Sequence, residues 1–303
     1  MDTVTDMNKK TIYALGFFDG VHLGHQALLR ECCRMAKELG CKTAAITFEQ
    51  HPQTLLGRDC PPLINNLEDR VRLLRYYGME TVQALPVTPE MMNRPWEAFL
   101  EDLVSQGAGG FVCGYDFRFG HKGLGTGEKL MAFCRQRGLA CAVVPEQTAG
   151  GIRVSSTHIR QLLEQGEPET AKVFLGHPHI LTGVVKKGKQ LGRTLGIPTA
   201  NLHLSPELAV PAFGVYACRC RIDGKYYLAV TNVGVRPTVS GFGITVEPWI
   251  LDYTGDLYDR TITLEFHKFL RPEEKFPDLE SLRLEIRKNA RQTREYFGTM
   301  EET

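Results

Sequence analysis

The stretch GFFDGVHLGH, residues 16–25, decides the fold of the first half of the chain. It follows an apolar run at residues 11–17 and leads into residues 26–39, where apolar side chains recur at helical spacing up to Gly40. In α/β folds, ligands bind beyond the carboxyl end of a strand and at the N-terminus of the next helix. The order of strand, glycine-rich turn and helix therefore predicts a parallel sheet with a phosphate site at this turn.

The same alternation of strand and helix patterns continues from this stretch to Pro145. Short apolar runs predict further strands at residues 42–48, 81–86 and 110–114. Helical spacing predicts helices over residues 67–77 and 95–106, and two shorter ones over 155–165 and 168–175. The first half is thus predicted to be a Rossmann-like α/β domain.

A change in composition around residues 176–182 marks the predicted boundary between two domains, residues 1–176 and 177–303. Beyond it, β-type segments separated by turn signals predict a small antiparallel barrel. These segments are residues 180–186, 214–222, 226–233, 244–252 and 261–269. Apolar residues at helical spacing over 278–297 predict one terminal helix packed against that barrel.

The composition excludes several classes of protein. Of the 303 residues, 43% are hydrophobic and 23% are charged. These are ordinary values for a globular chain and exclude a wholly disordered, collagenous or membrane-embedded one. Thirty-six Lys and Arg balance thirty-five Asp and Glu, so no overall charge favours nucleic acid or an anionic membrane. Residues 1–10 are polar and charged and lack the apolar core of a secretory signal, so we expect a cytoplasmic protein. The oligomeric state stays open.

The nine cysteines predict neither disulfides nor a zinc site. No CxxC pair occurs, and five cysteines lie inside apolar helix or strand patterns, which predicts reduced core residues. These are Cys32, Cys33, Cys113, Cys134 and Cys141. Cys218 and Cys220 alternate within a predicted strand without His or Cys partners at ligand spacing, so a metal role is disfavoured.

The residues of the 16–25 turn suit phosphoryl chemistry. Its three glycines permit close approach of the backbone to a phosphate. His22 and His25 are three residues apart, so both rings can face one point beside a helix N-terminus, where developing phosphoryl charge is stabilised. A tight turn with two surface histidines is the alternative. The position between a strand and a helix favours the functional interpretation.

This turn resembles the HxGH nucleotidyltransferases, and its form GxFDGVHxGHQ is similar to the FMN adenylyltransferase domain of prokaryotic bifunctional riboflavin kinase/FAD synthetases. GYDFRFG at residues 114–120 resembles the flavin-side loop of that family, and RVSSTHIR at residues 153–160 resembles its second nucleotide motif. The resemblance implies catalytic roles for His22, His25 and Arg160. It also implies ATP or phosphate binding by Gly16, Phe17, Asp19, Gly20, Gly24, Ser156 and Thr157, and flavin binding by Asp116, Phe117 and Arg118.

The implied reaction is in-line attack of the FMN phosphate on the α-phosphorus of ATP, with release of pyrophosphate. Catalysis would rest on positioning and charge stabilisation, with Mg²⁺ beside the protein groups. Some of these residues have plainer interpretations. Ser155 and Ser156 are helix N-cap types and Arg160 offers a planar fork for phosphate, but the same pattern also caps an ordinary surface helix. Asp116 could be a surface carboxylate in a turn, and Arg118 a solvated strand residue.

A second constellation, LTGVVKKGKQLGRTLGIPTAN, occupies residues 181–201. Its four glycines make a flexible loop whose amides can wrap polyphosphate, although the spacing is not that of a Walker A motif. The stretch is similar to the riboflavin kinase signature, including its PTAN element. The resemblance implies phosphate binding by Gly183, Gly188, Gly192 and Arg193, and Mg²⁺ binding by the oxygens of Thr199 and Asn201. For Thr199 and Asn201, turn chemistry after a proline is the alternative.

NVGVRPT at residues 232–238, VE at 246–247 and DLY at 256–258 extend the kinase resemblance. It implies that Glu247 is the catalytic base for the ribityl hydroxyl of riboflavin and that Arg236 contacts the flavin. An exposed strand position is the alternative for Glu247, and an ordinary ion pair is the alternative for Arg236. The chain departs from the family pattern twice: Pro248 predicts a bulge or an edge position, and Asp259 replaces a glycine.

These resemblances cover residues 11–298 and predict a bifunctional enzyme that uses ATP to convert riboflavin to FMN and FMN to FAD. One rival is an adenylyltransferase for another small phosphate, such as a pantetheine or nicotinate nucleotide, which leaves the C-terminal motifs unexplained. Another is a flavin-responsive regulator without turnover, and the balanced charge disfavours a nucleic-acid surface for it. We expect ATP, riboflavin and FMN as partners, and neither nucleic acid nor membrane.

Overall fold

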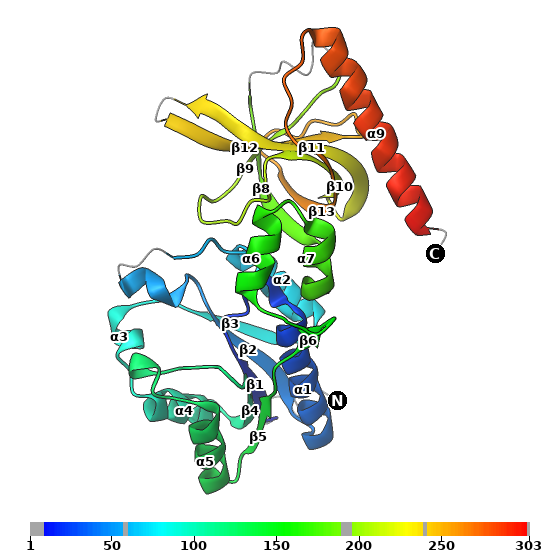
Figure 1. Cartoon of the computed structure of the whole chain (residues 1–303). Coiled ribbons are helices and arrows are strands. Elements are labelled where there is room, and N and C mark those ends of the chain that lie inside the picture. The colour runs from blue at the N-terminus through cyan, green and yellow to red at the C-terminus, as the bar shows by residue number, and fades with distance from the viewer. Residues whose placement is uncertain (1–8, 57–59, 189–195, 239–240, 302–303) are drawn as a thin grey trace. The chain divides into compact units, whose positions relative to one another are not determined.

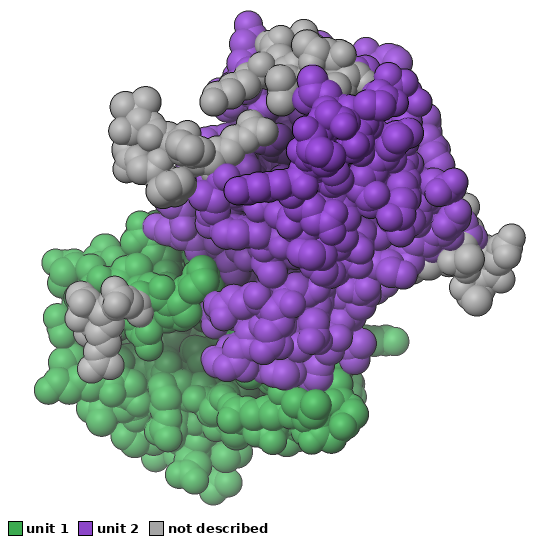
Figure 2. Space-filling model, turned by 45° about the horizontal axis from the view of Figure 1, so that its top comes forward, with its two compact units in different colours: residues 1–63, 67–156 green, residues 64–66, 157–303 purple. Residues whose placement is uncertain are grey.

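The computed structural model describes residues 9–56, 60–188, 196–238 and 241–301 (Figure 1). The chain forms two compact units, which Figure 2 shows in different colours. The first unit contains Met1–Leu63 and Leu67–Ser156, and the second contains Ile64–Asn66 and Thr157–Thr303. The predicted domain boundary after residue 176 falls later than this division, which groups the helices of residues 156–175 almost entirely with the second unit.

The first unit is a parallel sheet with helices on both faces (Figure 1). Its strands follow the order β3-β2-β1-β4-β5, and every neighbouring pair is parallel. The strands are β1 (Thr11–Leu15), β2 (Lys42–Phe48), β3 (Thr81–Leu85), β4 (Ala108–Gly114) and β5 (Ala140–Val144). The helices are α1 (Leu23–Leu39), α2 (Leu67–Tyr76), α3 (Pro89–Met92), α4 (Trp96–Ser105) and α5 (Gly127–Arg137). The predicted α/β fold of this half is confirmed.

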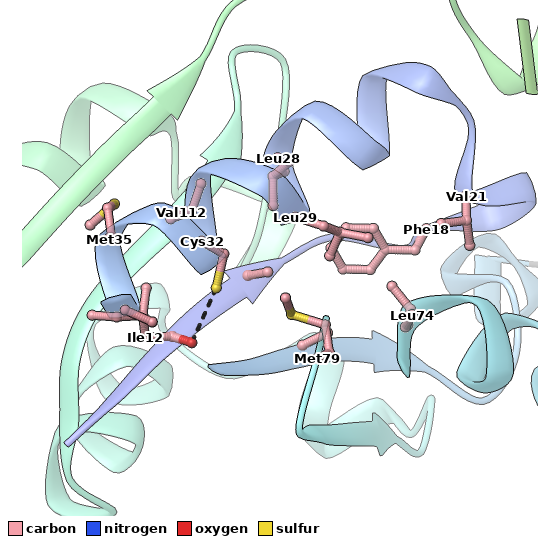
Figure 3. Close-up of a cluster of buried hydrophobic side chains, with 13 residues drawn as sticks. Ile12, Phe18, Val21, Leu28, Leu29, Cys32, Met35, Leu74, Met79 and Val112 are labelled. Carbon is pink, nitrogen blue, oxygen red and sulfur yellow. Dashed lines mark hydrogen bonds between the residues drawn. The ribbon is translucent and has the colours of Figure 1, made fainter. Parts of the chain in front are cut away.

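Strand β1 is buried on both faces, as expected for the central strand of a parallel sheet. Ile12 and Ala14 belong to a core cluster with residues of α1 and α2, which Figure 3 shows in close-up. Tyr13 and Leu15 belong to a second cluster with residues of α4 and α5. The strand order reverses at β1, between β2 and β4. The turn after β1 and the loop after β4 therefore face the crevice where ligands bind in such sheets.

Helix α1 starts at Leu23, three residues before its predicted start at residue 26. His22 is the N-cap residue, and its Nδ1 accepts a hydrogen bond from the backbone N–H of His25 at 3.3 Å. Histidine is not among the usual N-cap residues, so the sequence does not signal this start. The helix ends as predicted at Gly40, whose φ of 64° is the left-handed conformation common at helix ends.

The second unit is a closed antiparallel barrel with strand order β10-β11-β12-β9-β8-β13 (Figure 1). Its strands are β8 (His179–Lys186), β9 (Asn201–His203), β10 (Gly214–Ile222), β11 (Lys225–Thr238), β12 (Gly241–Ile250) and β13 (Thr261–Arg271). The helices of this part of the chain are α6 (Ser156–Glu164), α7 (Pro168–Leu175) and α9 (Leu279–Glu301). Helix α9 packs against β10 and β11. The predicted barrel with its terminal helix is confirmed.

Several short elements of the first unit were not predicted, because each is too short to show a period. They are η1 (Asp19–Val21), η2 (Pro52–Leu56), η3 (His121–Gly123), β6 (Thr148–Ala149) and β7 (Ile152–Arg153).

All nine cysteines are free thiols. Cys32, Cys113 and Cys134 are buried as predicted, but Cys33 and Cys141 are only partly buried and pack at the edges of the two clusters.

Candidate active sites

The turn between β1 and α1 has an unusual backbone. Phe18 and Val21 have φ values of 59° and 40°, in the left-handed region that non-glycine residues rarely adopt. Gly20 lies between them with a φ of 81°. Phe18 and Val21 are fully buried, and Figure 3 shows both side chains at one end of the core cluster, near Leu74 of α2. Strand β1 ends at Leu15, earlier than predicted, because the chain turns away from the sheet here.

The turn brings the two predicted histidines together. Their rings stack with centroids 3.7 Å apart and an angle of 12° between the planes. The Nδ1 of His22 accepts the His25 N–H, so this nitrogen carries no proton and the neutral ring carries its proton on Nε2. The pKa of His25 is held well below 6.5. Desolvation of the ring is the largest cause, and the electrostatic effects of His22 and Arg70 lower the pKa further. Near neutral pH, His25 can therefore donate a hydrogen bond as a neutral ring rather than act as a cation.

The glycines of the turn make room for its own side chains. A Cβ at Gly16 would lie 3.0 Å from the ring of Phe18, and a Cβ at Gly24 would lie 3.1 Å from the ring of His22. Larger residues at either position would displace these rings. The predicted approach of these glycines to a phosphate stays a prediction.

A cavity of about 710 Å³ opens beside this turn. Gly16, Phe17 and His25 line it from the β1–α1 turn, and residues 116–118 line it from the loop after β4. The structure thus brings the first motif and the predicted flavin-side residues Asp116, Phe117 and Arg118 to one cavity. Such a volume lies in the range of sites for small molecules. The other predicted turn residues, Asp19, Gly20, His22 and Gly24, do not line the cavity, and Asp19 and His22 are only 2% and 8% exposed.

The sequence did not identify most of the cavity wall. The additional aromatic, thioether and imidazole side chains come from segments without a recognisable motif. They include Phe48, His51, Met91, Met92 and Phe99, and Phe119 of the quoted GYDFRFG stretch joins them. An ion pair between Arg94 and Asp102 also lies on the wall. Phe48 and His51 come from the end of β2 and the residues after it, Met91 and Met92 from α3, and Phe99 from α4, and only the tertiary fold brings them together.

Asp116 is part of a network of polar side chains at the carboxyl ends of β4 and β5. Arg153 Nη2 lies 2.8 Å from Asp116 Oδ2, and Arg153 Nε lies 3.3 Å from Glu146 Oε2. The hydroxyl of Tyr115 donates to the same Glu146 oxygen at 2.7 Å. Arg153 is the first residue of the second nucleotide motif, but the sequence did not predict it to be a site residue. Its ion pair with Asp116 makes Arg153 a candidate residue of the flavin site.

The second nucleotide motif begins helix α6. The hydroxyl of Ser156 donates to the backbone carbonyl of Asp19 at 2.9 Å, so this motif is joined to the histidine turn within the first unit. Thr157 is exposed, and Arg160, one turn along α6, is only 9% exposed. Arg160 is thus not a solvent-exposed side chain, although Gln161 and Glu164 of the same helix are exposed. Thr157 and Arg160 belong to the second unit, and their contact with ATP stays a prediction.

In the barrel, strand register brings the predicted kinase residues together. Val246 pairs with Leu202, and Thr199 forms a bridge with Trp249. Both pairs follow one antiparallel register, which places Glu247 opposite Asn201. Because alternate residues share one face of a strand, Thr199, Asn201 and Glu247 lie on the same side of this strand pair. Glu247 is only 8% exposed, so the alternative of an exposed strand position is wrong.

The predicted glycine loop meets this group at one point. A Cβ at Gly188 would overlap the side-chain amide of Asn201, so Gly188 packs directly on this predicted metal ligand. The prediction that Gly183 belongs to the glycine loop is wrong. Gly183 lies inside β8, where a Cβ would clash with the backbone carbonyl of His203. The close approach of β9 explains that glycine. Gly192 and Arg193 lie outside the described residues, as does the side chain of Arg236.

The two departures from the family pattern are both accommodated. The register between β11 and β12 runs unbroken past Pro248, so the predicted bulge is wrong. The carbonyl of Pro248 accepts from Ala200 N–H at 2.9 Å, so its missing donor faces that segment and not β11. Asp259 has a φ of 58°, a conformation that glycine and aspartate tolerate. Its carboxylate pairs with Lys186 at 2.7 Å, and this hydrogen bond lowers the pKa of Asp259.

Asn232 is a further candidate in the barrel. It pairs with Glu247 across β11 and β12, and its Nδ2 donates to Glu273 Oε1 at 3.3 Å. A row of polar residues thus crosses three strands, from Asn232 through Glu247 to Asn201. The quoted NVGVRPT stretch begins at Asn232, so the sequence contained the signal, but only the register shows that this residue faces Glu247.

The two sites and their folds define a class of enzyme in which a nucleotidyltransferase-type α/β unit and a kinase-type β-barrel share one chain. The family model for FAD synthetase matches residues 4–158, and the family model for riboflavin kinase matches residues 175–297. The chain belongs to the family of bifunctional riboflavin kinase/FMN adenylyltransferases.

Similar proteins of that name span nearly the whole chain. The protein of Listeria monocytogenes is 33% identical and covers 99% of this chain and 96% of its own length. The protein of Bacillus subtilis is 33% identical, with coverage of 98% and 96%. The protein of Escherichia coli K12 is also 33% identical, with coverage of 95% and 93%.

One solved structure matches the fold over almost its entire length. It is described as a macrolide-efflux protein from Streptococcus pneumoniae, with a TM-score of 0.85, 29% identity and coverage of 96% of both chains. That description belongs to the streptococcal protein, and the shared feature is the fold. In the part of our chain that the structure describes, no helix combines the length and apolarity needed to cross a membrane.

Proposed function

We propose that this chain makes FAD from riboflavin in two ATP-dependent steps, with riboflavin phosphorylated in the second unit and FMN adenylylated in the first. The proposal rests on the family of the chain and on one observation about both units. Each unit brings together residues of the types that bind phosphate or its metal ion. In both units these residues come from segments that are far apart in the sequence. A chain with one activity would have no use for the second group.

In the first unit, a phosphate oxygen of FMN attacks the α-phosphorus of ATP, and the bond to pyrophosphate breaks. In the proposed domain of residues 1–176, His22, His25 and Arg160 donate hydrogen bonds to the charge that develops on the transferred group. The 710 Å³ cavity takes the apolar flavin ring, with the ring of Phe117 beside it and the charged side chains of Asp116 and Arg118 next to its polar groups. The nucleotide is held by Gly16, Phe17, Asp19, Gly20, Gly24, Ser156 and Thr157. No covalent bond to the enzyme forms.

In the second unit, Glu247 accepts the proton of the terminal ribityl hydroxyl as its oxygen attacks the γ-phosphorus of ATP, and ADP leaves. The low exposure of Glu247 suits a base that works away from bulk water. Gly183 supports this site through the packing of β8 on β9, while Gly188, Gly192 and Arg193 hold the phosphates. Arg236 contacts the flavin.

The donors beside Glu247 fit a magnesium ion. Thr199 offers a hydroxyl oxygen and Asn201 an amide oxygen, which are hard ligands of the kind that Mg²⁺ prefers, and Gly188 leaves the amide uncovered by a side chain. When bound, the ion would neutralise charge on the ATP phosphates. We further propose that residues 1–176 and 177–303 are the two functional domains. The small-molecule partners are ATP, riboflavin and FMN. The protein acts in the cytoplasm and binds neither nucleic acid nor membrane.

Product analysis tests this proposal. Purified protein is incubated with riboflavin, ATP and Mg²⁺, and the flavins are separated by chromatography. We expect FAD to accumulate after a transient rise of FMN. FMN alone would remove the adenylylation step, and a parallel incubation with pantetheine or nicotinate nucleotides would then test the rival substrates. Unchanged riboflavin would favour a flavin-binding regulator.

A further inference from the structure

A fully buried arginine supports the histidine turn. Arg70 lies on α2, and its side chain is 0% exposed. Its Nη1 donates to the backbone carbonyls of Phe17 at 3.2 Å and Phe48 at 3.0 Å, and to the Thr47 hydroxyl at 3.2 Å. Its Nε and Nη2 form no hydrogen bond within the described residues. A buried guanidinium with unused donors is costly for stability, so its presence calls for another explanation.

The contacts of Arg70 converge on Phe17. The carbonyl of Phe17 accepts a second hydrogen bond from the Thr47 hydroxyl at 2.7 Å. The guanidinium carbon also lies 4.5 Å from the centre of the Phe17 ring, within the range of a cation–π contact. Phe17 is therefore held at its backbone and at its ring, by α2 and by the end of β2.

Phe17 is the last residue before the strained part of the turn. Phe18 and Val21 stay in the left-handed region only if their surroundings hold them there. Leu74, one helical turn after Arg70, packs in the same cluster as Phe18 and Val21 (Figure 3). One face of α2 thus holds the turn twice, through a charged contact at Phe17 and through an apolar contact beneath Phe18.

We infer that Arg70 is a positioning residue for adenylyl transfer, which fixes the turn that holds His25 at the cavity wall and His22 stacked against it. The inference rests on the proposed function of the first unit. Arg70 is not among the residues that line the cavity, so we expect it to act through the turn and not by contact with substrate. Its role follows from the carbonyl it holds, two residues before the first residue of the family's DGVH sequence.

The charge of Arg70 also acts on His25. It adds to the desolvation and the His22 contact that keep the pKa of His25 low. Burial lowers the pKa of Arg70 itself, and the Asp19 carboxylate opposes that shift. The titratable or charged groups of the elements around His25 are His22 and Asp19 in the turn, Arg70 on α2, and His51, Asp116 and Arg118 along the cavity. Without the charge of Arg70, His25 takes up a proton at higher pH.

Two substitutions separate the geometry of Arg70 from its charge. Arg70→Met removes both, and we expect kcat for FMN adenylylation to fall about 100-fold, because small misplacements of reacting groups have effects of this order. Arg70→Lys keeps the charge but loses the planar fork and the ring contact, and we expect a fall of about tenfold. In both variants KM should change much less than kcat. The acid limb of the pH–rate profile should move to higher pH in Arg70→Met and stay in place in Arg70→Lys.

The same chain provides the controls. Phosphorylation of riboflavin by the second unit should be unchanged in both variants, which limits the effect of the substitutions to the first unit. Arg75→Met removes an exposed cation from the same helix and should leave both reactions unchanged.

Adenylylation by Arg70→Met within about threefold of the unaltered protein, with the same pH profile, would overturn the inference. If Arg70→Met does not fold, Arg70→Lys decides alone, and equal kcat values for it and Arg75→Met would overturn the inference. Failure of the unaltered protein to make FAD would instead remove the proposed function, whatever Arg70 does.

Discussion

The two candidate sites position their functional groups in different ways. In the first unit, a turn with two non-glycine residues in the left-handed region places His22 and His25, and distant residues hold that turn. In the barrel, the ordinary register of β12 and β9 places Glu247 opposite Asn201. The first site depends on support from outside its motif, whereas the second depends on the side chains of the motif and on room around them.

This difference decides where each site is vulnerable. The turn is held by Arg70 and Thr47 at Phe17, by the Gln26 amide at the Val21 carbonyl (2.9 Å), and by Ser156 at Asp19. We expect the loss of any of these contacts to change the orientation of the two histidine rings without removing either ring. The barrel strands are instead fixed by many ladder hydrogen bonds, so the strongest effects there should come from the reacting residues themselves.

The largest effect should come from Glu247→Ala. Without the base that accepts the hydroxyl proton, we expect phosphorylation of riboflavin to fall about 10²- to 10⁴-fold, the usual contribution of a general base. Adenylylation of supplied FMN should be unchanged, because the substitution leaves the first unit intact. Initial rates with riboflavin and with FMN as separate substrates measure both effects. A parallel loss of both rates would break the assignment of one step to each unit.

His22→Ala should have the opposite pattern. It removes one N–H donor and the acceptor that caps α1, and we expect FMN adenylylation to fall about 10²- to 10³-fold. Riboflavin should then stop at FMN. Accumulation of FAD at the ordinary rate would show that this ring does not contact the reacting phosphate.

Gly188→Ala tests how much room the barrel site needs. The added methyl group would overlap the amide of Asn201 and displace it, so we expect kinase activity to fall about 100-fold without loss of the fold. Gly298→Ala is the matched control, because a Cβ at Gly298 meets nothing within 4 Å. Equal kinase rates for the two variants would remove Asn201 from the site.

The pKa values of two histidines are lowered, and we expect one of them to affect the stability of the barrel and the other to affect the reaction in the first unit. His179 in the barrel is 0% exposed, and burial lowers its pKa to about 3, whereas His25 lines the cavity of the first unit. Because the folded pKa of His179 lies below the unfolded value of about 6.5, its contribution to stability is complete above that pH and declines as the pH falls. Between pH 6.5 and 5 we expect the barrel to lose about 2 kcal/mol of unfolding free energy.

Denaturant unfolding at several pH values measures this loss. Trp249 reports on the barrel when the second tryptophan is removed by Trp96→Phe, and His179→Gln in that background is the control. The control should lose correspondingly less stability on acidification. A pH dependence that is the same with and without His179 would contradict the expectation.

The smallest effect should come from Asp259→Gly, which restores the family's residue. Glycine keeps the left-handed backbone, and the lost ion pair with Lys186 joins two exposed side chains, so we expect the kinase rate to change less than about twofold. Asp259→Ala should lower the melting temperature more than Asp259→Gly, because alanine tolerates this φ less well. A large loss of kinase activity in Asp259→Gly would give Asp259 a role in the reaction.

Strand and helix patterns predicted the sheet, the barrel and the terminal helix, because period and turn residues are local properties of the sequence. The start of α1 was missed because a histidine caps it, and Gly183 was placed in a loop although β9 packs against it. The motif residues were found from the sequence, but Arg70 and Asn232 were not. Arg70 is separated from Phe17 by more than fifty residues of chain, and only the tertiary fold brings them into contact.

Complementation between two inactive variants tests the central claim most directly. His22→Ala and Glu247→Ala are each incubated with riboflavin, ATP and Mg²⁺, first alone and then as a mixture, and FAD is quantified. We predict that Glu247→Ala leaves riboflavin unchanged, that His22→Ala stops at FMN, and that the mixture makes FAD. A mixture that makes no FAD, or either variant making FAD alone at the rate of the unaltered protein, would contradict two separate sites that each perform one step.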